Sequence, residues 1–358
     1  MSETLLYPML FKPNLHKVIW GGTRLTTWKQ LDATTNQNEP VGESWEVSAV
    51  ESSPSIIANG GNVGRPLPDV ISENPEEILG AAVAKRYGNK LPLLVKFIDA
   101  ERDLSIQVHP DDIMAQREHG KFGKTEMWYV IDAKPGAYLY AGFKEHLSED
   151  DYKRKIADGT ITDALARHEV HRGDVFYIPA GRVHAICGGI LLAEVQQSSD
   201  VTYRIFDYNR PGMDGKPREL HTELAAQALD FNVYDEYRTI YKSAEAQANH
   251  CIDSHFFNVR VVDIDTPFHR NLIKYDSFII TMCMENDCLI KIRTTGDEVL
   301  LKEGWSCLIP SAIADYDIIP VPKESNKTGH VKLLDAFINN KDNSLVKRAT
   351  RFLHITRK

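Results

Sequence analysis

The 358-residue sequence lacks the features that mark several broad classes of protein. It has no run of basic residues and its net charge is −8, so nucleic acid is not expected as a partner. No apolar stretch approaches the roughly 18 residues that a membrane-spanning helix needs. No basic segment followed by an apolar run marks a signal peptide. The sequence therefore predicts a cytoplasmic protein that binds neither nucleic acid nor membrane.

Cysteine is scarce, and its spacing does not indicate a metal site or a disulfide framework. The five cysteines are odd in number and form no CxxC pair, which favours a reducing compartment. The nearest two, Cys283 and Cys288, lie in an apolar strand-like run. The favoured interpretation is that they are small buried hydrophobic residues.

The remaining composition is typical of an ordinary globular protein large enough for two or three domains. Short apolar runs broken by glycine and proline predict a mainly β fold. A helical insert is expected at about residues 143–170, where Ser148 precedes acidic residues that suit a helix start. A polar stretch at 232–254 separates two predicted domains, residues 1–240 and 255–358.

Residues 104–112 contain a glutamine and a histidine two positions apart. In a strand, Gln107 and His109 would point to the same face. Glu126 follows in the run 123–129, and His184 ends the run 173–184. One amide, two imidazoles and one carboxylate form a plausible ligand set for a divalent metal inside a β-barrel.

Each of these residues also has an ordinary structural interpretation. A single strand histidine is more often hydrogen-bonded than metal-bound, and Gln107 alone would be a strand residue facing the lumen. Lys96 lies within the apolar run 91–100, so it needs a buried partner or a function, unless its side chain extends to solvent. Asp111 and Asp112 are better interpreted as caps of the following helix than as catalytic residues.

The spacing of Gly173, Pro179, Gly181 and His184 resembles the second motif of the cupin barrel. Residues 304–315 repeat this spacing, but Asp315 takes the place of the ligand histidine. A repeated barrel is inferred, and its second copy has lost the metal. The expected fold is mainly β, with two cupin-type jelly-roll barrels, the second degenerate, and a small helical insert.

Taken together, the motifs resemble those of type I mannose-6-phosphate isomerases of the short bacterial form. The resemblance covers essentially the whole chain and is more specific than the cupin pattern alone. One departure follows the ligand histidine, where Ala185 and Ile186 give an aliphatic wall. The motifs that carry the resemblance are residues 20–22, 42–46, 107–111, 123–129, 173–184 and 198–204.

The resemblance implies one zinc ion per chain and a sugar-phosphate substrate. Nitrogen and oxygen ligands without thiolate suit catalytic rather than structural zinc. The implied reaction interconverts mannose 6-phosphate and fructose 6-phosphate by moving a proton between C2 and C1 through a cis-enediol. The implied metal ligands are Gln107, His109, Glu126 and His184.

The resemblance also implies roles for residues around these ligands. Arg204 would stabilise the enediolate or place the substrate, and Glu194 is a candidate acid/base. Lys124 would bind phosphate or assist proton transfer, while Ser105 and Lys96 would contact the substrate. The structural alternatives are an Arg204 pair with Asp200 or Asp207, a Glu194 carboxylate tied to the backbone, and a solvated Lys124.

Two other functions remain open at this level. An iron cupin dioxygenase would usually need three histidines, or two with a carboxylate, so Gln107 argues against it. A non-enzymatic carbohydrate-binding cupin would be expected to have a decayed site, whereas all four ligands and Arg204 are present. The sequence gives no indication of the oligomeric state.

Overall fold

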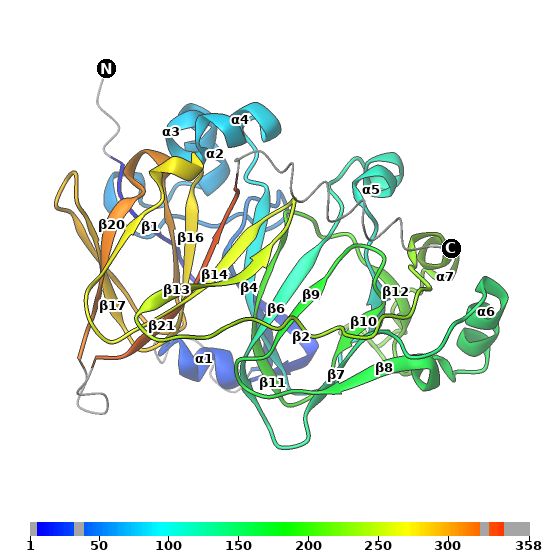
Figure 1. Cartoon of the computed structure of the whole chain (residues 1–358). Helices are drawn as coiled ribbons and strands as arrows, with labels where there is room; N and C mark the ends of the chain where they lie inside the picture. Colours follow the sequence, from blue (N-terminus) through cyan, green and yellow to red (C-terminus); the bar gives the residue numbers. More distant parts are fainter. Residues whose placement is uncertain (1–5, 32–38, 323–328, 340–358) are drawn as a thin grey trace. The chain divides into compact units, whose positions relative to one another are not determined.

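The protein is described from a computed structural model at residues 6–31, 39–322 and 329–339 (Figure 1). The chain forms two compact units, each assembled from segments that are distant in sequence. The site unit consists of the described residues within Pro13–Ser53 and Leu93–Ile240, and the C-terminal unit consists of those within Met1–Lys12, Pro54–Pro92 and Tyr241–Lys358. Within the described ranges, no helix is both long and apolar enough to cross a membrane.

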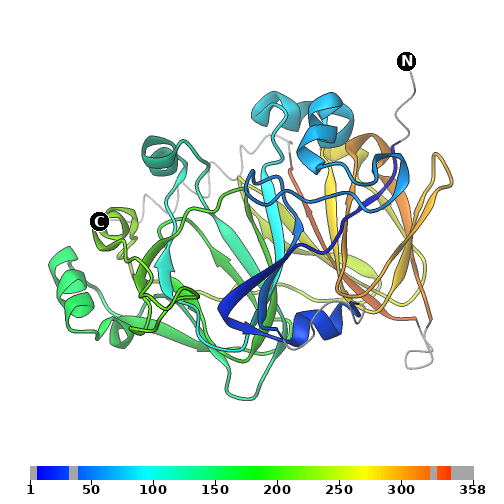
Figure 2. The same cartoon turned by 180° about the vertical axis from the view of Figure 1, so that it is seen from behind.

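The site unit is built from two antiparallel sheets. β2 (Leu15–Gly22), drawn in dark blue, pairs with β3 (Val41–Val47) and with the cyan β4 (Leu93–Ala100) in the first sheet (Figure 2). The order of the first sheet is β2 (Leu15–Gly22), β3 (Val41–Val47), β4 (Leu93–Ala100), β11 (Ile190–Gln197), β6 (Glu126–Ala133) and β9 (Val175–Ile178). The order of the second is β12 (Tyr203–Phe206), β5 (Ile106–Val108), β10 (His184–Ile186), β7 (Tyr138–Phe143) and β8 (Leu165–Glu169).

The central strands of the first sheet, β4 and β11, are buried along their whole length. Their nearly continuous apolar sequences suit strands that are covered on both faces. Side chains of both sheets meet in one apolar cluster, with Trp128 and Leu192 from the first sheet and Leu139 and Ile186 from the second. The charged Lys96 and Glu194 are exceptions within these strands, and their burial requires an explanation.

The helical insert is shorter than the sequence predicts. It contains α6 (Glu149–Ala157), which begins with a capping box at Ser148, and the short η2 (Ile161–Ala164). Residues 165–169, expected to be helical, instead form β8, because Leu165 is buried and the segment pairs with the edge of β7. The other helices of this unit are α1 (Arg24–Trp28), α5 (Asp112–His119), which Asp111 caps, and α7 (Thr222–Ala228).

The C-terminal unit also contains two antiparallel sheets, together with the helices of residues 67–87. These helices are α2 (Leu67–Glu73), α3 (Pro75–Leu79) and α4 (Ala81–Tyr87). One sheet has the order β1 (Met9–Leu10), β19 (Ser306–Ile309), β16 (Ile279–Glu285), β21 (Val331–Phe337), β14 (Asn258–Ile264) and β13 (Gln247–Asp253). The other has the order β15 (Phe268–Asn271), β20 (Asp315–Pro320), β17 (Cys288–Ile292) and β18 (Glu298–Leu301).

The two units repeat one strand order. The series β14, β21, β16, β19 corresponds to β4, β11, β6, β9, and the series β15, β20, β17, β18 corresponds to β5, β10, β7, β8. Asp315 begins β20 as His184 begins β10. The mainly β fold with two related barrels is therefore confirmed, while the loss of metal from the second barrel stays a prediction.

The units differ in membership from the domains drawn on the sequence. Residues 6–12 and 54–92 were placed with the first domain, but they belong to the C-terminal unit. One reason is long-range pairing, since β1 is an edge strand beside β19. Residues 340–358 of the predicted second domain lie outside the described residues.

The C-terminal barrel holds a buried ion pair that predicts a large effect on stability. The carboxylate of Asp335 accepts hydrogen bonds from Arg270 (2.9 Å) and Thr281 (2.8 Å). Replacing Asp335 with alanine should lower the free energy of unfolding by about 3–5 kcal/mol, because the guanidinium stays buried without its counter-charge. Denaturant unfolding measures this. Glu298→Ala, which breaks an exposed pair with Lys291, should change stability far less, and equal losses would contradict the account.

Candidate active site

Strand register places the candidate residues in two rows within the site unit. In the first sheet, Glu194 on β11 lies opposite Lys96 on β4 and opposite Trp128 on β6. In the second sheet, Gln107 on β5 lies opposite both His184 on β10 and Arg204 on β12. Neighbouring strands are about 4.8 Å apart, so each row gathers side chains that are far apart in sequence.

Three of the predicted ligands converge. The ligand atoms of His109, Glu126 and His184 all lie within 4.8 Å of one another, and all three residues are buried. Nε2 of His109 lies 3.4 Å from Oε2 of Glu126, and Nε2 of His184 lies 3.3 Å from Oε1 of the same carboxylate. The chain can therefore hold a metal ion here.

Backbone carbonyls orient both imidazoles toward this point. Nδ1 of His109 lies 3.0 Å from the carbonyl oxygen of Val201, and Nδ1 of His184 lies 2.8 Å from that of Arg182. A ring that donates from Nδ1 presents the lone pair of Nε2, which is how metal-binding histidines are usually held. This arrangement fits a metal ion rather than two histidines that only pack.

The electrostatics of the cluster also fit a cation. The ammonium of Lys124 lies 2.9 Å from Nε2 of His109 and 2.6 Å from Oε2 of Glu126. Burial and the charge of Lys124 lower the pKa of His109 to about 3, so the ring is neutral. Although burial opposes it, Lys124 holds the pKa of Glu126 well below its usual range. Two neutral imidazoles and an ionised carboxylate are the protonation states that metal binding requires.

Gln107 lies at the edge of the same cluster. Its Nε2 is 3.3 Å from Nε2 of His184, and Ser105 Oγ lies 3.4 Å from its Oε1. A half-turn of the amide exchanges these two atoms and would direct Oε1 at the cluster. Gln107 thus lies beside His184 and Ser105 beside Gln107, while their roles as metal ligand and substrate contact stay predictions.

The first sheet contributes a carboxylate-rich side to the site. The Lys96 ammonium lies 3.4 Å from each of Glu43 and Glu194, and 4.9 Å from the ring centre of Trp45. Burial opposes the charge of Lys96, but the two carboxylates outweigh it and raise its pKa. Glu194 also accepts a hydrogen bond from the Trp128 indole (3.0 Å). Lys96 therefore has a buried partner in Glu194 and a half-buried one in Glu43, which is the first of the alternatives that the sequence left open.

Glu194 has the properties of a proton-transfer group. Burial, and after it the charge of Glu126, raises the pKa of Glu194 above that of an ordinary glutamate. Its carboxylate hydrogen-bonds the indole of Trp128 rather than the backbone, so the structural alternative of a backbone-tied carboxylate is wrong. A buried carboxyl with a raised pKa in a cleft is a candidate acid/base.

The opposite side of the site is rich in arginine. Arg204 donates from Nη1 to the carbonyl oxygen of Glu219 (3.0 Å) rather than to a carboxylate. The carboxylates proposed as its alternatives are engaged elsewhere, because Asp200 pairs with Lys121 and Asp207 pairs with Arg218. The positive charge of Arg204 is therefore not neutralised by either of these carboxylates and can attract an anionic ligand.

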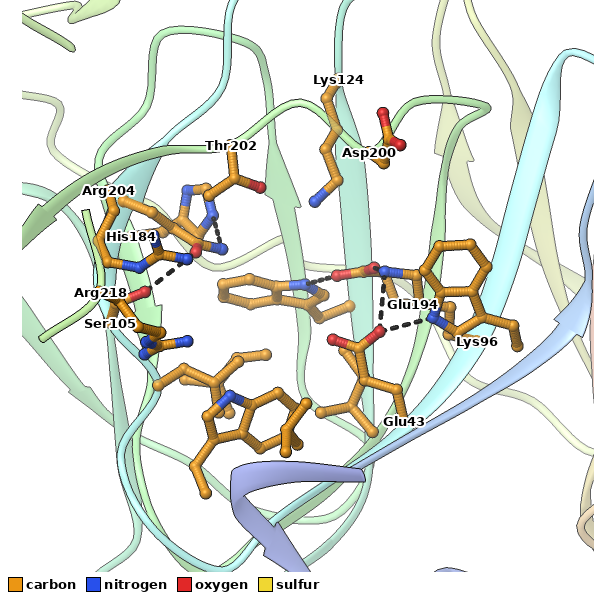
Figure 3. Close-up of a pocket in the computed structure, with 18 residues that line it drawn as sticks. Glu43, Lys96, Ser105, Lys124, His184, Glu194, Asp200, Thr202, Arg204 and Arg218 are labelled. Atoms are coloured by element: carbon orange, nitrogen blue, oxygen red, sulfur yellow. Dashed lines mark hydrogen bonds and ion pairs between the residues drawn. The ribbon is translucent and has the colours of Figure 1, made fainter. Parts of the chain in front are cut away.

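A cavity of about 200 Å³ connects these groups. Figure 3 shows Arg204, Arg218 and Ser105 on one side of it and Lys96, Glu43 and Glu194 on the other. Among the predicted residues, those that line the cavity are Lys96, Ser105, Gln107, Lys124, His184, Glu194 and Arg204.

The sequence analysis missed several residues of the cavity. Glu43 and Trp45 belong to the motif 42–46, and as alternate residues of β3 they share one strand face, which was the available signal, but no role was given to them. Arg218 belongs to no motif. The only signal in the sequence was that three arginines lie close to Asp207 within residues 204–218. The other missed lining residues are Val18, Trp20, Ile98, Leu104, Trp128, Asp200 and Thr202.

Comparison with known proteins identifies the family. Residues 9–139 match the family model described as phosphomannose isomerase type I, catalytic domain. The chain is 37% identical to mannose-6-phosphate isomerase ManA of Bacillus subtilis over 65% of this chain and 71% of that protein. It is 39% identical to the mannose-6-phosphate isomerase of Streptococcus mutans over 62% of this chain and 67% of that protein.

A solved structure supports the same assignment over nearly the full chain. The crystal structure of the mannose 6-phosphate isomerase from Bacillus subtilis matches with a TM-score of 0.80 and 31% sequence identity. The match covers 92% of this chain and 99% of that one. These similarities agree with the ligand cluster and the strand order, and they show that the chain belongs to the type I phosphomannose isomerase family.

Proposed function

We propose that this chain is a zinc-dependent isomerase that interconverts mannose 6-phosphate and fructose 6-phosphate. The observation that carries the proposal is the convergence of His109, Glu126 and His184, with both Nε2 atoms directed by backbone carbonyls. This cluster adjoins a cavity that also contains a proton-transfer carboxylate and an arginine without a carboxylate partner. These are the groups that an aldose–ketose isomerase needs.

Zinc suits this ligand set because the donors are imidazole nitrogen and carboxylate oxygen, with no thiolate. Gln107 would complete the set through Oε1 after the half-turn of its amide. When bound, the metal supplies Lewis-acid polarisation of the sugar oxygens at C1 and C2. The ligands would be Gln107, His109, Glu126 and His184.

Glu194 is the proposed acid/base of the reaction. In the open-chain aldose, its carboxylate takes the proton from C2, and the electron pair left on carbon forms the C1–C2 double bond. The π bond of the C1 carbonyl breaks at the same time, and its electrons move onto O1, which takes the proton of the C2 hydroxyl as the cis-enediol becomes the ketose. The same carboxyl then returns the proton to C1 and gives the ketose. A raised pKa brings this carboxyl closer to the neutral range in which both transfers are efficient.

The cations beside Glu194 have supporting roles. Lys96 compensates the paired charges of Glu43 and Glu194, so two carboxylates can remain buried side by side. Its ammonium also reaches the cavity and would contact sugar hydroxyls, as would Ser105. Lys124, beside Glu126, would assist proton movement between the two substrate oxygens.

Arg204 is proposed to stabilise the negative charge that develops on the enediolate. Its register position opposite Gln107 places it next to the row of metal ligands. A guanidinium that needs no reorganisation at the moment of reaction stabilises developing charge efficiently.

Removal of the metal tests the proposal. The purified chain should contain about one zinc per molecule and should lose its isomerase activity after dialysis against a chelator, because the metal-free cluster lacks the Lewis acid that polarises the substrate oxygens. Adding zinc back should restore the conversion. Full activity of a chelated, metal-free sample would contradict the proposed role of the cluster.

A further inference from the structure

The charges of the cavity are distributed unevenly. On the carboxylate side, Lys96 is shared by Glu43 and Glu194, so negative charge exceeds positive charge there. Lys124 is likewise compensated by Glu126, at 2.6 Å. The cations of this side are therefore occupied by carboxylates of the chain itself.

The opposite side has the reverse balance. Asp207 is 5% exposed and accepts hydrogen bonds from two arginines, Arg210 (2.9 and 3.0 Å) and Arg218 (2.6 and 2.7 Å). The single negative charge of Asp207 is thus shared by two guanidinium groups. The side chain of the neighbouring Arg204 donates to a backbone carbonyl oxygen rather than to a carboxylate. Arg204, Arg210, Arg218 and Asp207 together carry a net charge of +2, and the two of them that line the cavity, Arg204 and Arg218, complement a phosphate dianion.

The backbone around Asp207 adopts an unusual turn. Tyr208 and Asn209 both have left-handed conformations, with φ of 56° and 52°, and the N–H of Arg210 donates to the carbonyl of Asp207 (3.2 Å). A turn with two left-handed residues favours glycine or asparagine, so a tyrosine at its first central position is strained. Strain of this kind persists where surrounding contacts over-determine the conformation, often at ligand sites.

The chain then reverses and brings Arg218 back to the cavity. The N–H of Gly212 donates to the carbonyl of Lys216 (2.7 Å), and Pro211 pairs with Pro217 as an isolated bridge. Arg218 follows directly and contacts Asp207 through Nε and Nη2. Arg218 lines the cavity, and its Nη1 is left as a donor for a ligand.

We propose that Arg218 binds the phosphate of the substrate and that Asp207 is the positioning residue that holds Arg218 in place. The inference rests on the proposed function, because it assigns the phosphorylated end of that substrate to one side of the cavity. The sugar carbons then lie toward the metal ligands and Glu194. Selection for a phosphorylated hexose arises from the arginine side rather than from Lys96 or Lys124.

The test is a kinetic comparison of Arg218→Met with the matched variant Arg154→Met, which removes an arginine from an exposed pair with Asp151. Arg218→Met should raise the KM for mannose 6-phosphate by about 10- to 100-fold, the usual effect of losing a charge-assisted contact. Its kcat should change by only a few-fold, because the reacting carbons are elsewhere. Arg154→Met should leave both values unchanged.

A direct binding measurement separates this inference from the proposed function. Titration calorimetry of the zinc-loaded protein with inorganic phosphate should give a Kd that rises about 10-fold or more in Arg218→Met. Arg218→Lys should recover part of the phosphate affinity. The phosphate Kd of Asp207→Asn should lie between those of the wild type and Arg218→Met, because Arg218 loses its ion pair with Asp207. Thermal unfolding of each variant identifies any that fail to fold.

The outcomes distinguish the two hypotheses. Unchanged KM and unchanged phosphate affinity in a folded Arg218→Met variant would overturn the inference and leave the isomerase proposal intact. A fall in kcat at constant KM would also overturn it. If the wild-type protein converts no mannose 6-phosphate, the proposed function fails, and phosphate affinity alone still decides whether Arg218 binds the anion.

Discussion

Replacing His184 with alanine should lower kcat by about 1,000-fold or more and should reduce the zinc content of the purified protein. The imidazole is one of three converging ligands, and no other described side chain on β10 can take its place, since Ala185 and Ile186 follow. Metal-assisted charge stabilisation and orientation are lost together, which accounts for the size of the effect.

Metal analysis and a coupled isomerase assay on the same sample measure both losses. The control is His171→Ala, because the His171 side chain is 72% exposed in the same unit and lies outside the cavity lining. It should leave kcat and zinc content unchanged. A His184→Ala variant that retains zinc and turnover would show that the zinc lies elsewhere.

Replacing Glu194 with glutamine should lower kcat by about 100- to 10,000-fold, the range usually lost with a general acid/base. The amide has the same shape and can still meet the Trp128 indole and the Lys96 ammonium, but it cannot accept the C2 proton. Zinc content should stay at the wild-type level, which distinguishes this variant from His184→Ala.

The pH dependence of kcat gives a second readout for Glu194. Because burial raises the pKa of this carboxyl, the acid limb of the wild-type profile should lie above the pH at which an ordinary glutamate titrates. Glu169→Gln, at an exposed position on β8, should leave the profile unchanged. A Glu194→Gln variant with wild-type kcat would assign the proton transfer to another group.

The metal cluster could be predicted from the sequence because short sequence patterns identify its residues. Gln107 and His109 share a strand face through simple alternation, and the glycine and proline spacing before His184 fixes a recognisable hairpin. The repeat at residues 304–315 likewise predicted the second barrel, whose strand order matches the first. In these cases the alternation of side chains along a strand, or the geometry of a turn, determines where the side chains point.

The charge distribution of the cavity could not be predicted in the same way. The sequence allowed Arg204 to pair with Asp207. In the structure, the strained turn at Tyr208 and the chain reversal at residues 211–217 instead bring Arg210 and Arg218 to that carboxylate. Such partners depend on how separate loops meet in space. The pairing of Met9 and Leu10 with β19, which places these residues in the C-terminal unit, likewise joins segments that are far apart in the sequence.

The most direct test of the account is to follow mannose 6-phosphate by NMR in the presence of the zinc-loaded protein. The account predicts that fructose 6-phosphate appears until the two sugars reach equilibrium, and that the His184→Ala protein gives no such conversion under the same conditions. Failure of the zinc-loaded wild-type protein to form fructose 6-phosphate would contradict the account.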